Sequence, residues 1–140
     1  MGWTIKLLLP VVFLLESFAA AADLQPTIAV HGPTVVAFFA PVSDKELKAH
    51  PDINESLSDF QFYAGGARKA FQNSNIEFHV IYAKSFKIRV GTRTTTFRVG
   101  KSGVGYYFVT PGKKPRVEYG VMTDSDMVEI AKQYFGKTGK

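Results

Sequence analysis

The sequence contains no cysteine, and this excludes several kinds of chemistry at once. Disulfides, thiolate metal sites, iron–sulfur clusters and thiol nucleophiles all need a cysteine sulfur. Histidine is also scarce, because the three in the chain, His31, His50 and His79, lie far apart in sequence. Their spacing predicts no metal site. We therefore expect no metal and no thiol catalysis, and we assign no cofactor and no catalytic residue.

Long apolar runs are missing as well. The run at residues 7–15 falls well short of the roughly 20 residues that a membrane-spanning helix needs. Lys6 precedes this run, and the small residues Ala19–Ala22 follow it. Basic, apolar and small-residue regions in this order predict a secretory signal peptide at residues 1–22. We expect residues 23–140 to be exported to a periplasm or the extracellular space, with no transmembrane segment.

The length and charge limit the possible partners. A chain of 140 residues with 46% hydrophobic residues has room for one globular domain. Lys and Arg number 17 against 12 Asp and Glu, and the net charge of +5 favours anionic partners. The sequence has no nucleic-acid-binding motif, and exported proteins seldom meet nucleic acid, so we expect no such partner.

Hydrophobic patterning divides residues 23–140 into strands and helices. Residues 34–40 form an apolar run between prolines, which predicts a strand buried on both faces, and residues 27–30 favour an edge strand before it. An apolar stripe predicts a helix that follows a capping box at Asp52 and Glu55. The Gly65-Gly66 pair inside this helix suggests close packing against a sheet. The stripe consists of Leu57, Phe60, Ala64, Ala67 and Phe71.

The second half of the chain is richer in strands. Residues 76–83 alternate as a strand does, and residues 86–90 and 93–99 flank a Gly91-Thr92 turn that suits a hairpin. In that register Phe86 faces Phe97 and Ile88 faces Thr95. Residues 106–109 and 116–119 predict a second hairpin. A last helix is expected between a cap at Thr123 and a stop at Gly136.

The order of these elements resembles the thioredoxin-like fold. Residues 35–41 (VVAFFAP) look like the central strand that leads into the redox loop of that family. Residues 105–112 (GYYFVTPG), residues 117–120 (VEYG) and the last helix look like its C-terminal β-β-α half. The resemblance implies a single α/β domain: a central mixed β-sheet flanked by helices, here with an added β-hairpin in place of a short helix.

The family's functional residues are missing at the matching positions. Ser43, Asp44, Lys45 and Glu46 stand where the family carries its Cys-x-x-Cys motif, and Val104 stands where it has a cis-proline. Thiol–disulfide exchange needs a thiolate, so the resemblance extends to the fold and not to redox activity.

Three groups of residues are candidates for binding. Ser43–Glu46 follow a central parallel strand, where ligands commonly bind, although Ser43 also suits the cap of a helix that begins at Asp44. A basic hairpin face, with Arg93 and Lys101 near its ends, suits an anion or an acidic protein; its alternative is a solvated or edge-protecting face. Several tyrosines suit either a partner-binding patch or the core. The basic face consists of Lys87, Arg89 and Arg98, and the tyrosines are Tyr63, Tyr82, Tyr107 and Tyr119.

We expect a redox-inactive binding or scaffold module of the cell envelope that engages another protein. The alternative is a small-molecule binding protein or weak hydrolase that uses a cleft beside Ser43. A third hypothesis is a basic protein that coats anionic envelope polymers, whose affinity would fall steeply with salt.

Overall fold

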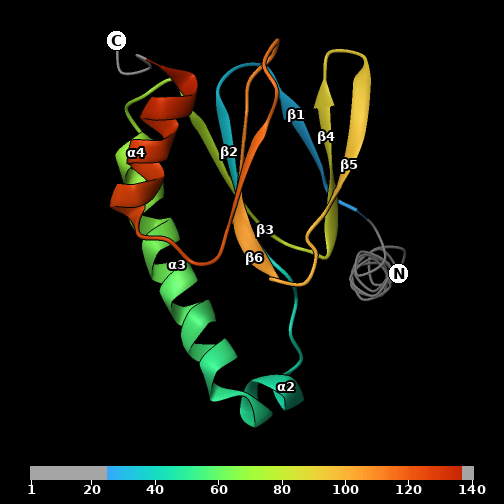
Figure 1. Ribbon diagram of the computed structural model, residues 1–140, viewed down its shortest axis with the longest axis vertical. Coiled ribbons are helices and arrows are strands. Elements are labelled where there is room, and N and C mark those ends of the chain that lie inside the picture. The colour runs from blue at the N-terminus through green and yellow to red at the C-terminus, as the bar shows by residue number, and fades with distance from the viewer. Residues whose placement is uncertain (1–24, 137–140) are drawn as a thin grey trace, which may run out of the picture.

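The computed structural model describes residues 25–136, so the expected signal peptide at residues 1–22 lies outside the described part of the chain. Figure 1 shows the arrangement of the elements within it. In chain order these are β1 (Thr27–Val30), β2 (Thr34–Phe39), α2 (Asp44–Ala49), α3 (Pro51–Phe71), β3 (Glu77–Tyr82), β4 (Ser85–Val90), β5 (Arg93–Arg98), β6 (Val104–Val109), β7 (Arg116–Tyr119) and α4 (Asp124–Phe135).

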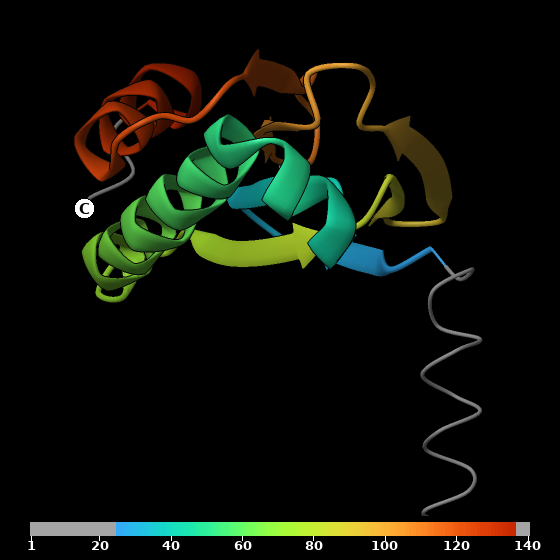
Figure 2. The same ribbon diagram turned by 90° about the horizontal axis from the view of Figure 1, so that it is seen from below.

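The strands form two sheets. The central sheet has the order β3-β2-β6-β7, in which β2 is parallel to β3 and antiparallel to β6. The outer sheet has the order β1-β4-β5, with β1 parallel to β4 and β4 antiparallel to β5. Helices α3 and α4 cover one face of the central sheet, and the outer sheet lies on the other side (Figures 1 and 2).

The mixed α/β class and the β4-β5 hairpin are confirmed, but the expectation of one sheet flanked by helices is wrong in one respect. The hairpin β4-β5 pairs with β1 and forms a sheet of its own. This outer sheet takes the place of helices on one face of the central sheet. None of the helices between residues 25 and 136 is long and apolar enough to cross a membrane.

Strand β2 is buried on both faces, as its apolar run predicts. Side chains alternate along a strand, so Val35, Ala37 and Phe39 enter a core beneath the helices. Val36 and Phe38 enter a second core between the two sheets. Strand β6 divides in the same way, with Tyr106 and Phe108 on the helix side and Tyr107 on the outer-sheet side. The central sheet therefore separates two cores.

The hairpin has the predicted register. Phe86 pairs with Phe97 and Ile88 with Thr95, and Gly91 has φ +61°, as the first residue of a type II′ turn requires. Phe86 and Ile88 are buried against the central sheet. Lys87 and Arg89 therefore lie on the opposite, exposed surface of the outer sheet.

The helices differ from the prediction at their ends. The stripe of α3 is buried as predicted, but no capping box lies at Asp52: α3 begins at Pro51, and His50 makes no side-chain cap bond. The capping box belongs to Ser43 and Glu46 at the start of α2. Gly66 packs against the side chain of Asp124 at the start of α4, and not against a sheet. Thr123 caps the start of α4, and Gly136 follows the last residue of this helix, as predicted.

Candidate functional site

The Ser43 loop lies where β2 ends, and its side chains are engaged in capping α2. The Ser43 hydroxyl accepts a bond from the Glu46 amide, 3.1 Å away, and donates to the Glu46 carboxylate, 3.2 Å away. Asp44 and Glu46 occupy the first turn of α2, where carboxylates favour the helix dipole. Ser43, Asp44, Lys45 and Glu46 are all exposed, and α2 has no buried residue. Ser43 thus acts as a cap, one of the two alternatives that the sequence left open.

Val104 lies near this loop but belongs to the interior. The amide of Ala40 donates to the carbonyl of Gly103 over 2.6 Å, which ties the end of β2 to the start of β6. The Val104 side chain is buried in the core beneath the helices. Neither of the two cavities described between residues 25 and 136 is lined by Ser43 or Val104.

Lys87, Arg89 and Arg98 form one surface, which we call the basic face. Lys87 and Arg89 are two residues apart on β4 and point to the same side. Arg98 lies diagonally across from Lys87, because Lys87 pairs with Thr96. On the other side of β4, Thr27 and Ala29 pair with Lys87 and Arg89 and carry no charge. The basic face lies on the outer sheet, whereas the Ser43 loop follows β2 of the central sheet, so the structure places the two predicted groups on different sheets.

Within residues 25–136, no carboxylate forms an ion pair with the basic face. The ion pairs among the described residues join His79 to Glu77 and Arg116 to Glu118, all outside the outer sheet. The sequence already indicates this separation of cations from carboxylates, because residues 78–117 contain no Asp or Glu. Nine cations lie in that stretch, namely Lys84, Lys87, Arg89, Arg93, Arg98, Lys101, Lys113, Lys114 and Arg116. The net charge of this segment, counted apart from that of the whole chain, predicts such a cluster of cations.

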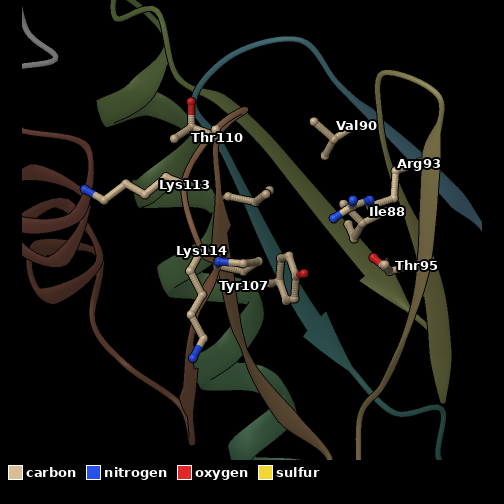
Figure 3. Close-up of a pocket in the computed structure, with 11 residues that line it drawn as sticks. Ile88, Val90, Arg93, Thr95, Tyr107, Thr110, Lys113 and Lys114 are labelled. Carbon is tan, nitrogen blue, oxygen red and sulfur yellow. The ribbon is translucent and has the colours of Figure 1, made fainter.

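A cavity of about 550 Å³ opens between the outer sheet and the end of β6 (Figure 3). We call it the inter-sheet cavity. Ile88, Tyr107 and Val109 are buried side chains that line it, and the β6–β7 loop contributes Thr110 and Lys114. Thr34 of β2 pairs with Val109, whereas Phe39 pairs with Val104. The cavity therefore lies at the amino end of β2, opposite the end that leads to Ser43.

The sequence pattern predicts Arg93 near the end of the basic face, but the strand alternation places it on the other side of β5. Arg93 pairs with Val90 and shares the inner side of β5 with Thr95 and Phe97. Arg93 and Thr95 both line the inter-sheet cavity. Each end of β5 thus carries an arginine, one directed to the cavity and one to the basic face.

Tyr107 is held firmly in the cavity wall. Its ring packs edge-on against Phe97, with centroids 5.0 Å apart, and against Phe86 at 6.0 Å. Burial raises the pKa of Tyr107 above its usual value of 10.0. The hydroxyl is therefore protonated near neutral pH and can donate a hydrogen bond.

The tyrosines proposed for a partner patch are divided between core and surface. Tyr107 is buried and Tyr63 is half-buried, whereas Tyr82 and Tyr119 are 48% and 56% exposed. Phe62, which was not among the predicted partner residues, is 75% exposed. Tyr82 and Phe62 lie on β3 and α3, and Tyr119 lies on β7, at the other edge of the central sheet. These aromatics therefore do not form one continuous strip along a single edge.

No protein-family model, curated protein or solved structure matches this chain. Within residues 25–136, no group of three or more His, Asp and Glu side chains could hold a metal ion.

Proposed function

We propose that this protein is an exported, redox-inactive binding module that engages an acidic partner protein of the cell envelope through its basic face. The observation that carries the proposal is the exposed cluster of Lys87, Arg89 and Arg98, which forms no ion pair with a carboxylate of residues 25–136. Like charges close together repel each other, so an anionic partner relieves this repulsion when it binds. The absence of cysteine excludes thiol–disulfide exchange.

A thioredoxin-like arrangement is part of the proposal. Its support is the central sheet, in which the parallel pair β2-β3 joined through α3 is followed by the antiparallel strands β6 and β7 and then α4. This is the order of elements on which the resemblance rests. The outer sheet then replaces the short helix of that family, and its exposed surface becomes available for a partner.

The binding surface can be tested with two variants of equal net charge. The basic-face variant replaces Lys87, Arg89 and Arg98 with Gln. The helix variant replaces Lys48, Lys69 and Lys132, which are exposed on the helices, with Gln as well. Each lowers the net charge of +5 by three. Tagged wild-type protein and both variants are cross-linked briefly in the native envelope, and the bound proteins are identified by mass spectrometry.

We expect one acidic protein to be captured by the wild type and the helix variant, but not by the basic-face variant. Equal capture by all three proteins would contradict the proposal. A diffuse, salt-sensitive set of anionic molecules that both variants lose equally would instead favour a general coating of envelope polymers.

Export is tested separately. We expect the intact mass of the protein recovered from its native compartment to correspond to a chain without residues 1–22. A recovered chain that retains those residues would contradict this part of the proposal.

A further inference from the structure

The proposed function involves the basic face and not the inter-sheet cavity. The lining of this cavity has the composition of a ligand site. Its volume of about 550 Å³ lies within the usual range of roughly 300–1,000 Å³ for small-molecule pockets. The floor is apolar, because Ile88, Val109 and the ring of Tyr107 are all buried there. Such a floor favours a hydrocarbon body over a polar one.

The polar groups of the cavity are donors and cations, and none of its lining residues is acidic. Figure 3 shows the guanidinium of Arg93 directed into the cavity from the outer sheet, and the Tyr107 hydroxyl directed toward the side that Thr95 lines. No carboxylate of residues 25–136 forms an ion pair with Arg93. A planar guanidinium with two parallel donors matches a carboxylate in both charge and shape.

The two lysines of the lining do not compete for this role. The Lys113 ammonium lies 4.5 Å from the centre of the Tyr134 ring and donates to the Tyr134 carbonyl. In Figure 3 the side chains of Lys113 and Lys114 extend away from the side of the cavity where Arg93 enters. Arg93 is therefore the cation that faces the apolar floor.

We propose that the inter-sheet cavity binds a small amphiphilic carboxylate. Its hydrocarbon body lies on Ile88, Tyr107 and Val109, and its carboxylate pairs with Arg93 at the mouth, within reach of the Thr95 hydroxyl. This site is independent of the basic face, since Arg93 and Arg98 point to opposite sides of β5. A negative result for carboxylate binding in the cavity therefore does not contradict partner binding at the basic face, and the reverse also holds.

Decanoate is the probe, and decan-1-ol, which lacks the charge, is the matched neutral compound. Binding is measured by calorimetry and by amide and methyl chemical shifts in solution. Arg93→Gln removes the cation, and Arg98→Gln removes the same charge from the other side of the same strand. Thr95→Trp fills the mouth from an exposed position, so the core packing is left intact. Thermal unfolding checks that each variant is folded.

We expect decanoate to shift the resonances of Ile88, Tyr107 and Val109 and to bind more tightly than decan-1-ol. Arg93→Gln should weaken binding by roughly tenfold or more, because it removes a charge-assisted hydrogen bond. Thr95→Trp should abolish binding, and Arg98→Gln should leave it unchanged. The proposal is overturned if decanoate shifts none of these resonances in the wild type. Equal weakening by Arg93→Gln and Arg98→Gln would also overturn it, because it would show attraction to the net charge alone.

Discussion

At the scale of single residues, Gly105 shows why a small side chain is needed inside the central sheet. A Cβ atom at this position of β6 would lie 2.5 Å from the backbone oxygen of Glu118 and 2.7 Å from the ring of Phe38. Phe38 in turn packs against Phe86 and Phe97 of the outer sheet. The absence of a side chain at Gly105 thus allows the ring of Phe38 to fill the core between the sheets.

We expect Gly105→Ala to lower the free energy of unfolding by about 1–3 kcal/mol, the usual cost of overpacking a core. Gly65→Ala is the matched control, because the added Cβ meets nothing within 4 Å beyond its chain neighbours and the backbone of its own helix, and the site is inside α3. That variant should be more stable by about 0.5–1 kcal/mol. Urea unfolding of both variants measures the difference, and a neutral Gly105→Ala would contradict the described packing.

Tyr106 and Tyr107 link stability to alkaline pH. Burial raises the pKa of both hydroxyls above 10.0, so the unfolded chain loses these protons before the folded chain does. The unfolded state is then favoured as the pH rises, and stability is lost above about pH 10. Unfolding free energies measured from about pH 8 to pH 11 should fall, and the fall should be shallower in Tyr107→Phe. Identical slopes in the two proteins would contradict this linkage.

At the scale of elements, two helix caps of the same chemistry have different consequences. Ser43 caps α2, which has no buried residue, whereas Thr123 caps α4, which buries Met127, Ala131 and Tyr134. Both side chains accept a bond of 3.1 Å from the amide three residues on. Fraying of α4 exposes core, and fraying of α2 does not.

We therefore expect Thr123→Ala to lower the free energy of unfolding by about 1 kcal/mol, the usual loss for a helix cap. Ser43→Ala should stay within about 0.5 kcal/mol of the wild type, as is usual for surface substitutions. Denaturant unfolding compares the two, and amide exchange at residues 44–47 should still rise in Ser43→Ala. A global loss in Ser43→Ala equal to that in Thr123→Ala would show that α2 supports the core.

The same helices show what a local pattern can and cannot predict. The stripe of α3 was predictable because the 3.6-residue period is a property of the helix itself. The position of the capping box was not, because Asp52–Glu55 and Ser43–Glu46 have the same spacing in sequence. Pro51 at the first turn of α3 lets that helix begin before Asp52.

At the scale of the whole molecule, the three layers protect the backbone unequally. Strands β2 and β6 are covered on both faces and paired on both sides. Strand β5 is an edge of the outer sheet, and all its residues except Phe97 are exposed. The central sheet should therefore open only when the protein unfolds.

Hydrogen–deuterium exchange followed by mass spectrometry tests this order. We expect the amides of β2 and β6 to exchange most slowly and those of β5 to exchange fastest among the strands. The free edge of β5 requires only local opening, which costs less free energy than unfolding of the core. Exchange of β5 as slow as that of β2 would mean that another surface covers it in solution.

Composition and local patterning were enough to exclude thiol chemistry, to locate most strands and helices, and to predict the register of the β4-β5 hairpin. These follow from composition, from periodicity and from one tight turn, all of which act between near neighbours. The pairing of β4 with β1 in a separate sheet depends on the tertiary structure. The same two segments are joined by a hydrogen bond that the Gln25 side chain donates to the hydroxyl of Ser85, 60 residues later. Such pairing between distant segments has no local signal, because both strands show the same alternation in either sheet. The inter-sheet cavity, and the opposite directions of Arg93 and Arg98, follow from that long-range pairing.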